Sequence, residues 1–145
     1  MNLIFQKVKN FKNSEAIYRI NNDKLTRKNS ANTKKFSYQT HLNWLKKNLK
    51  NKREFITLII LKKKIVGLIR EKKIYNKPYL SWALDEKYRG KKIGKHMLKK
   101  YVNKNKKKYV AKIRRNNLPS IKICEYAGFK KFRENSKFRY FVKLR

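Results

Sequence analysis

A short basic segment with two glycines, Tyr88 to Lys95, carries the residues whose types and spacing best suit chemistry. The apolar stretch Tyr79 to Leu84 lies before it and predicts a buried strand, while apolar residues recur at helical spacing after it, from Ile93 to Val102. A basic loop between a strand and a helix directs unpaired backbone N–H groups and the positive end of the helix dipole at one point, which suits a phosphate group. Gly90 and Gly94 lack Cβ atoms, so a ligand can approach the backbone closely there.

The glycine spacing differs from that of two common nucleotide-binding loops, since the chain contains neither G-x-x-x-x-G-K-[ST] nor G-x-G-x-x-G. The segment from Arg89 to Gly94 resembles instead the pattern [RQ]-x-x-G-x-[GA], with which the GNAT superfamily of N-acyltransferases binds acetyl-CoA. Lys92 stands where that pattern has its first glycine. Taken alone, the segment is also compatible with a basic helix start that binds no ligand.

A second segment, Asn117 to Phe129, resembles the N-x-x-[SA]-[IV]…G-F block of the same superfamily. Ser120 is a candidate N-cap of a helix, and Gly128 is a candidate residue just beyond the end of that helix. The two blocks occur in the superfamily's order, and the distance between them leaves room for one helix and one strand. With both blocks, the chain is identified as a member of the GNAT superfamily and is expected to be an N-acetyltransferase.

The resemblance implies how acetyl-CoA, the expected co-substrate, would bind. In the superfamily its pantetheine arm lies between two strands that splay apart, the central strand and the next one, which are Tyr79 to Leu84 and Lys108 to Ile113 here. The pyrophosphate would lie on the basic loop, and a backbone N–H near the end of the central strand would polarise the thioester oxygen. The expected cofactor-binding residues are Trp82, Leu84, Arg89, Gly90, Lys91, Lys92, Ile93, Gly94, Lys95 and Asn117.

The rest of the chain predicts the elements that position this site, in the order β-α-α-β-β-β-α-β-α-β. Antiparallel hairpins combined with β-α-β crossovers predict an α/β (α+β) fold with a mixed, mostly antiparallel sheet flanked by helices. The residues 21–30 between the first two helices are expected to form a polar loop. The expected strands are 3–11, 54–61, 65–70, 79–84, 108–113 and 137–144, and the expected helices are 14–20, a helix capped by Ser37, 93–102 and 120–127.

The composition limits the class of protein. A length of 145 residues suits a single acyltransferase domain, 1–145. No signal-peptide pattern or membrane-spanning stretch is recognisable, and the lone Cys124 excludes an internal disulfide, so a cytoplasmic location without membrane insertion is expected. Two histidines and one cysteine make a metal site unexpected. A homodimer is left open.

The net charge of +35 raises the alternative of a nucleic-acid-binding protein on a non-catalytic scaffold of this kind. The charges are spread over every segment and lysine far outnumbers arginine, whereas nucleic-acid-binding elements more often combine arginine with interleaved aromatic residues. Nucleic acid is therefore not the expected partner, although the positive field would attract any polyanion, including CoA and nucleotide sugars.

The N-terminal third of the chain narrows the class of acceptor substrate, again by resemblance. Its pattern from Asn22 to Arg27, followed by that from Ser37 to Trp44, is similar to GNAT enzymes that acetylate UDP-linked 4-amino sugars on the route to pseudaminic acid, a surface sugar. Enzymes that acetylate the N-termini of ribosomal proteins have a similar pattern near the start of their own sequences. A protein N-terminus or another small amine therefore remains an alternative acceptor. The expected residues for a nucleotide-linked amino sugar are Asn22, Asp23, Arg27 and His41.

The sequence leaves the general base open. Many relatives place a glutamate on the central strand, at the position of Tyr79 here. A histidine has the most suitable unperturbed pKa for this role. The candidates are His41, Asp23, Glu71 and, through a water molecule, Ser81.

The general acid is equally open, because Cys124 occupies the position at which many relatives have a tyrosine that protonates the departing thiolate. Tyr126 lies two residues later, on another face of the expected helix. The N-terminal candidates also have structural alternatives: Asp23 as the cap of a turn, Arg27 as its ion-pair partner and His41 as a packed helix residue.

Overall fold

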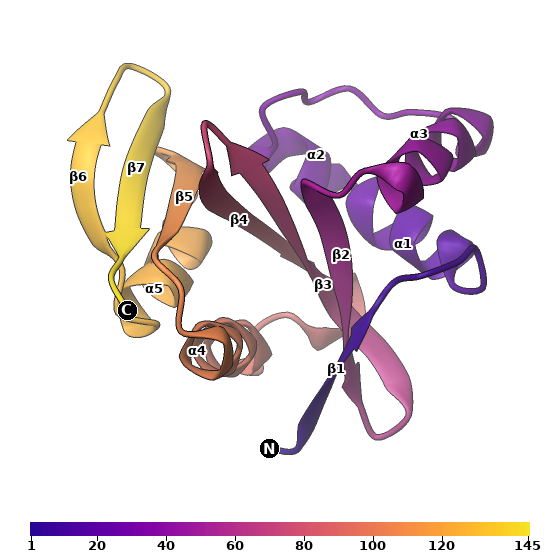
Figure 1. Cartoon of the computed structure of the whole chain (residues 1–145), viewed down its shortest axis with the longest axis horizontal. Helices are drawn as coiled ribbons and strands as arrows, with labels where there is room; N and C mark the ends of the chain where they lie inside the picture. Colours follow the sequence, from indigo (N-terminus) through magenta and orange to yellow (C-terminus); the bar gives the residue numbers. More distant parts are fainter.

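The computed structural model describes residues 1–145 and consists of one mixed seven-stranded sheet with helices on both faces (Figure 1). The strand order is β1-β2-β3-β4-β5-β7-β6. The strands are β1 (Leu3–Lys7), β2 (Glu54–Leu61), β3 (Lys64–Ile74), β4 (Lys77–Leu84), β5 (Tyr109–Arg114), β6 (Lys130–Glu134) and β7 (Phe138–Lys143). The helices are α1 (Ser14–Asn21), α2 (Lys24–Asn29), α3 (Tyr38–Lys50), α4 (Ile93–Asn105) and α5 (Leu118–Tyr126), with a 3₁₀ turn, η1 (Glu86–Tyr88).

Two tight hairpins connect β2 to β3 and β3 to β4. The central residues of the first turn, Lys62 and Lys63, have φ values of 49° and 66°, and those of the second, Tyr75 and Asn76, have 50° and 62°. Two-residue turns with positive φ at both positions match the right-handed twist of antiparallel strands. Both hairpins were expected, but β3 continues to Ile74 and the second turn is therefore shorter than the sequence indicated.

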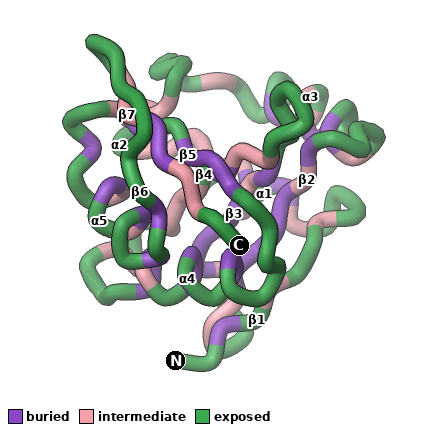
Figure 2. Tube along the Cα trace, turned by 60° about the vertical axis from the view of Figure 1, so that its left-hand side comes forward, coloured by how far each residue is buried: buried purple, intermediate pink, exposed green.

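Two apolar clusters hold the helices on the sheet. The larger one packs α4 and α5 against one face and contains Met97, Leu98 and Phe141, while the smaller one packs α1 and α3 against the other face and contains Ile17 and Leu45. Figure 2 shows that burial concentrates along the central strands and that the chain ends are exposed. The sheet therefore separates two faces, an α4–α5 face and an α1–α3 face.

The strands β4 and β5 run parallel but pair at only one position, Tyr79 with Val110. By contrast, β3 and β4 pair at eight positions, from Gly67 opposite Leu84 to Ile74 opposite Lys77. Beyond Tyr79 the edge of β4 that faces β5 has no paired strand, which confirms the predicted splay between these two strands.

Two elements differ from the sequence-based expectation. Residues 21–30 were expected to form a loop but contain α2, because the carboxylate of Asp23 accepts hydrogen bonds from the backbone N–H groups of Leu25 (3.2 Å) and Thr26 (3.4 Å) and so caps a short polar helix. Strand β6 was not predicted, because all five of its residues are exposed and no alternation of apolar and polar residues marks it. The first strand also ends at Lys7 rather than at Phe11.

None of the helices combines the length and the apolar composition that crossing a membrane requires. No group of three or more histidine, cysteine, aspartate or glutamate side chains lies close enough together to hold a metal ion.

Candidate active site

The basic loop follows β4 and leads directly into α4, as the sequence predicts. The first hydrogen bond of this helix runs from the N–H of His96 to the carbonyl of Lys92 (3.3 Å), so the N–H groups of the three preceding helical residues have no partner within the helix. The side chains of Lys91 and Lys92 are exposed beside them. Free donors and positive charge at one helix start can hold a phosphate group.

Lys92 and Gly90 give this loop its shape. Lys92 adopts the left-handed conformation, with φ of 64° and ψ of 8°, immediately before α4. This conformation favours glycine, which explains why the matching sequence pattern has glycine there. Gly90 also has a positive φ of 74°, and a Cβ atom added to it would meet nothing within 4 Å. The surface above Gly90 is therefore open to a ligand.

Gly94 has a packing role that its place in the motif does not predict. A Cβ atom on Gly94 would lie 2.6 Å from Cδ1 of Ile123 in α5, so the missing side chain lets α4 and α5 pack closely. This contact gives the missing side chain a packing role beside the one expected from the motif, and the binding of a ligand at Gly94 stays a prediction. Its backbone N–H still belongs to the unpaired first turn of α4.

The side chain of Arg89 turns away from the loop and toward α2. It forms an ion pair with Asp23 and donates hydrogen bonds to the hydroxyl of Thr26 (3.3 Å) and the carbonyl of Leu84 (3.2 Å). Burial alone would raise the pKa of Asp23, but the hydrogen bonds from Arg89 and Thr26 outweigh it and hold this pKa below its usual range. Asp23 is therefore an anchored carboxylate and a weak base, and its ion-pair partner is Arg89 rather than Arg27.

A second arginine fixes the other end of α2. Arg114, at the end of β5, donates from Nε to the carbonyl of Ser30 (2.9 Å) and from Nη2 to the carbonyl of Ala31 (3.2 Å). Since Arg89 follows β4 and Arg114 ends β5, α2 is attached to both of the strands that splay apart. We call these two attachments the α2 tethers.

Asn22 holds the segment that links α2 to α3. Its side-chain amide donates to the carbonyl of Phe36 (3.0 Å) and to the hydroxyl of Tyr18 (3.1 Å), and its oxygen accepts from the N–H of Phe36 (3.0 Å). The structure therefore gives this predicted substrate residue a role in shaping the site.

Positive charge collects on the α1–α3 face beside the splay. Arg27 lies over the ring of Phe36 (5.1 Å), and its Nε is buried without a hydrogen-bond partner. Burial, and to a smaller extent the positive charge of Arg70, lower the pKa of Arg27, although Arg70 is itself paired with Glu54 (3.3 Å). In the sheet, Arg70 lies opposite Ser81, whose side chain is exposed. An anion bound at this position would pair with Arg27 and relieve the repulsion.

His41 lies in an aromatic cluster between α1 and α3. Its ring is 5.4 Å from that of Tyr18, 5.9 Å from that of Tyr38 and 5.8 Å from that of Trp44, and the residue is only 1% exposed. Burial lowers the pKa of His41 by more than the nearby backbone of Ser14 raises it, so its ring is neutral at pH 7. The structure places this candidate base among packed aromatic rings, and neither of its ring nitrogens has a hydrogen-bond partner.

Trp82 and Leu84 lie on β4 and pack against the larger apolar cluster, on the face that α4 covers. The Nε1 of Trp82 is buried without a partner. Asn117 caps α5, since its side chain accepts a hydrogen bond from the N–H of Ser120 (3.3 Å), which corrects the expectation that Ser120 is the N-cap. Gly128, with φ of 98°, follows the end of α5 as predicted.

Cys124, Tyr126 and Glu71 differ in their access to the loop. Cys124 is fully buried, and this burial raises its pKa well above the usual range, so its thiol keeps its proton. Tyr126 is exposed beside Lys95 and Lys99, whose Nζ atoms lie 5.5 Å and 4.7 Å from the centre of its ring. The carboxylate of Glu71 is bound by other side chains near the opposite end of α4.

Sequence reasoning missed three cations of this site: Arg70, Lys112 and Arg114. Their register places Lys112 and Arg114 on one face of β5, two residues apart, with the buried Ile113 on the other face. That alternation of charged and apolar residues was visible in the sequence, but the face on which the charges lie depends on the sheet.

The same fold occurs in solved acetyltransferase structures. PseH, an N-acetyltransferase from Campylobacter jejuni in complex with acetyl coenzyme A, matches with a TM-score of 0.76 and 16% identity over 99% of both chains. RimL, a ribosomal-protein α-N-acetyltransferase in complex with coenzyme A, matches with a TM-score of 0.83 and 14% identity over 99% of this chain and 94% of the other. Spermidine N-acetyltransferase from Vibrio cholerae, in complex with CoA and spermine, matches with a TM-score of 0.82 and 13% identity over 98% of this chain and 95% of the other.

These likenesses confirm the predicted fold, and their low identity limits them to the fold. No curated protein sequence matches the chain significantly. The profile of the acetyltransferase (GNAT) family matches residues 15–129, which include both sequence blocks, the splayed strands and the start of α4. Because this match covers well over half of the sequence, the chain belongs to the GNAT family and is an N-acetyltransferase.

Proposed function

We propose that the chain transfers an acetyl group from acetyl-CoA to a primary amine of a nucleotide-linked amino sugar. The donor would bind with its pyrophosphate on the free N–H groups at the start of α4 and its pantetheine arm along the unpaired edge of β4. The solved structures of PseH and RimL, which share this fold, contain acetyl-CoA or CoA. The open splay and the basic helix start therefore support acetyl-CoA as the donor.

In this proposal a neutral amine attacks the thioester carbonyl, and the negative charge that develops on its oxygen is stabilised by a backbone N–H of β4. The carbon–sulfur bond then breaks, CoA leaves as the thiolate, and the amine loses one proton. Ser81 is the candidate base best placed to pass that proton to solvent through a water molecule, because its side chain is exposed on the α1–α3 face. Holding amine and thioester together supplies much of the rate.

The observation that carries the choice of acceptor is the pair Arg27 and Arg70. Arg70 is paired with Glu54 (3.3 Å), and the Nη atoms of Arg27 donate to the carbonyl of Lys34 (3.4 Å) and the hydroxyl of Ser30 (2.8 Å), so the buried Nε of Arg27 is the donor of this pair that is left for a phosphate oxygen. A nucleotide-linked sugar brings two phosphates, whereas a polyamine brings positive charge, which this face would repel. The acceptor is therefore expected to carry negative charge near its amine.

The test offers acetyl-CoA with three acceptors, a UDP-linked 4-amino sugar, spermidine and a peptide with a free N-terminus, and measures released CoA thiol. We expect transfer to the sugar nucleotide at least tenfold above the other two, because the charge of the acceptor matches the site. Preference for spermidine or the peptide would overturn the acceptor, and failure to bind acetyl-CoA at about 0.15 M salt would overturn the donor.

A charge-matched pair of variants sharpens this test. Arg27→Gln should raise the KM for the sugar nucleotide roughly tenfold and leave the KM for acetyl-CoA unchanged. Arg53→Gln removes the same charge from an exposed position before β2 and should change neither constant. Equal effects of the two variants would mean that general electrostatic attraction, rather than a site at Arg27, selects the acceptor.

A further inference from the structure

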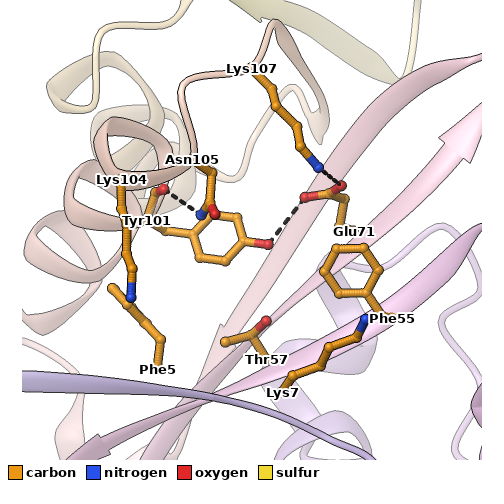
Figure 3. Close-up of a pocket in the computed structure, with 9 residues that line it drawn as sticks. All are labelled: Phe5, Lys7, Phe55, Thr57, Glu71, Tyr101, Lys104, Asn105 and Lys107. Carbon is orange, nitrogen blue, oxygen red and sulfur yellow. Dashed lines mark hydrogen bonds and ion pairs between the residues drawn. The ribbon is translucent and has the colours of Figure 1, made fainter.

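A second pocket lies on the α4–α5 face of the sheet, near the end of α4 rather than its start (Figure 3). It is open to solvent, has a volume of about 200 Å³ and lies between β1, β2, β3 and the C-terminal end of α4. The 13 residues of α4 rise roughly 20 Å, so the basic loop lies about one helix length away. The pocket is therefore separate from the proposed acetyl-CoA site.

Glu71 is the only acidic residue of the pocket, and other side chains of the chain donate hydrogen bonds to its carboxylate. It is 1% exposed, and its two carboxylate oxygens accept from the hydroxyl of Tyr101 (3.1 Å) and from Nζ of Lys107 (3.1 Å). Burial and the negative charge of Glu71 raise the pKa of Tyr101 far above its usual range, so this hydroxyl remains a donor. The buried carboxylate anchors the inner wall of the pocket, and the ammonium group of Lys107 balances its charge.

The rim of the pocket carries cations without acidic partners. Nζ of Lys7 lies 4.4 Å from the centre of the Phe55 ring, and Nζ of Lys104 lies 5.9 Å from the centre of the Phe5 ring. Neither Lys7 nor Lys104 takes part in an ion pair. The third lysine of the pocket, Lys107, is paired with Glu71. Three ammonium groups against one carboxylate leave the opening with two positive charges, and an anion between them would lower their mutual repulsion.

The neutral groups of the pocket complete a site of mixed character. Thr57 and Asn105 contribute a hydroxyl and an amide, and the rings of Phe5 and Phe55 form apolar walls. A volume of about 200 Å³ has room for a compact organic anion.

We propose that this pocket binds a small organic dianion, a phosphate monoester or a dicarboxylate. Its charged groups lie between Lys7, Lys104 and Lys107, and its carbon atoms lie against Phe5 and Phe55. The proposal concerns binding alone and does not depend on the acetyl transfer proposed above.

The test follows NMR signals of the ¹⁵N-labelled full chain at about 0.15 M salt, which weakens general attraction to a chain of charge +35. Glycerol 3-phosphate and succinate are the dianionic probes, and acetate and glycerol are the controls. We expect the side-chain amide of Asn105 and the backbone amide of Lys107 to shift saturably with a dianion and not with either control. The comparison of the two dianions shows whether phosphate or carboxylate is preferred.

Two double variants with the same loss of charge make the test specific. Lys7→Gln with Lys104→Gln should weaken dianion binding roughly tenfold or more. Lys46→Gln with Lys47→Gln, on the exposed side of α3, should leave it within about twofold. All four lysines are exposed, so both variants should keep the melting temperature of the parent chain.

The proposal is overturned by equal weakening in the two double variants, by shifts spread over all lysine-rich surfaces, or by the absence of a saturable shift up to about 10 mM probe.

Discussion

The two faces of the sheet are held by different kinds of contact. On the α4–α5 face, an apolar cluster of 18 buried residues joins α4 and α5 to strands from both ends of the chain, β1 to β5 and β7. On the α1–α3 face, a cluster of six buried residues is supplemented by polar side-chain contacts between residues far apart in the sequence, above all the α2 tethers. This contrast indicates that the face proposed to bind acetyl-CoA is stabilised mainly by apolar packing. The face proposed to bind the acceptor depends on a few individual polar side chains.

The largest effect is expected from Arg89→Ala, which breaks the tether between α2 and the end of β4. Arg89 and Asp23 are 26% and 18% exposed, so the substitution leaves a mostly buried carboxylate without its partner and should lower the free energy of unfolding by about 3 kcal/mol. Urea denaturation measures this change. Arg115→Ala breaks an exposed pair with Glu134 (3.6 Å) and should cost at most about 1 kcal/mol. Similar losses in the two variants would contradict a special role for the tether.

The same tether predicts a dependence of stability on pH. The pKa of Asp23 is lower in the folded chain than its unfolded value of about 3.9, so its contribution is fully present above that pH and disappears as the pH falls through the folded pKa. Asp23→Asn should therefore lower stability by about 1–2 kcal/mol at pH 7 and decline less than the parent chain between about pH 5 and pH 2. Parallel stability curves over this range would show that Asp23 is not the titrating group.

The second tether, through Arg114, is expected to contribute less to the free energy of unfolding. Arg114 donates to the carbonyls of Ser30 and Ala31, which are neutral acceptors, so Arg114→Ala should lower the free energy of unfolding by about 1 kcal/mol. Because it frees the C-terminal end of α2 beside the splay, we also expect a higher KM for the acceptor with an unchanged KM for acetyl-CoA. An increase in the KM for acetyl-CoA alone would contradict this prediction, because it would mean that the tether supports binding of the donor rather than of the acceptor.

The sequence was most informative where neighbouring residues form the structure. The basic loop, the helix α4 and the end of α5 at Gly128 follow from local spacing, and the structure has all three. The helix α2 was missed because none of its residues is buried, so no apolar periodicity marks it, and because the partner that holds Asp23, Arg89, is 66 residues away. The helical position of His41 was predicted, but a helical pattern cannot show that aromatic rings from α1 and the segment before α3 would surround it.

The substitution Lys92→Gly is expected to have a smaller effect on the free energy of unfolding, an increase instead of a decrease. Lys92 holds a left-handed conformation that costs a non-glycine residue roughly 1 kcal/mol, and its side chain is exposed. Glycine should therefore raise the free energy of unfolding by up to about 1 kcal/mol and leave kcat unchanged, since the proposed pyrophosphate site uses backbone N–H groups. Denaturation and steady-state kinetics check both parts, and a large fall in kcat would reveal a role for the lysine side chain.

The smallest effect is expected from His41→Phe, and it separates packing from catalysis. The ring of His41 is buried, its lowered pKa keeps it neutral, and neither nitrogen has a hydrogen-bond partner, so burying it costs desolvation energy that phenylalanine would not incur. Phenylalanine is slightly larger, and overpacking offsets part of this gain. We therefore expect a melting temperature close to that of the parent chain, with kcat and both KM values within about twofold.

If His41 instead accepts the amine's proton, the same variant keeps its melting temperature while kcat falls roughly 10²–10⁴-fold and the acidic limb of the pH profile shifts. A rise in the acceptor KM alone would mean that the histidine binds the sugar. These outcomes are distinguishable because phenylalanine leaves no empty space at this position, so a loss of activity could not be attributed to a cavity in the aromatic cluster. Unchanged kinetics would assign the aromatic cluster to the support of α1 and α3 and leave proton transfer to the exposed edge of β4, where Ser81 lies.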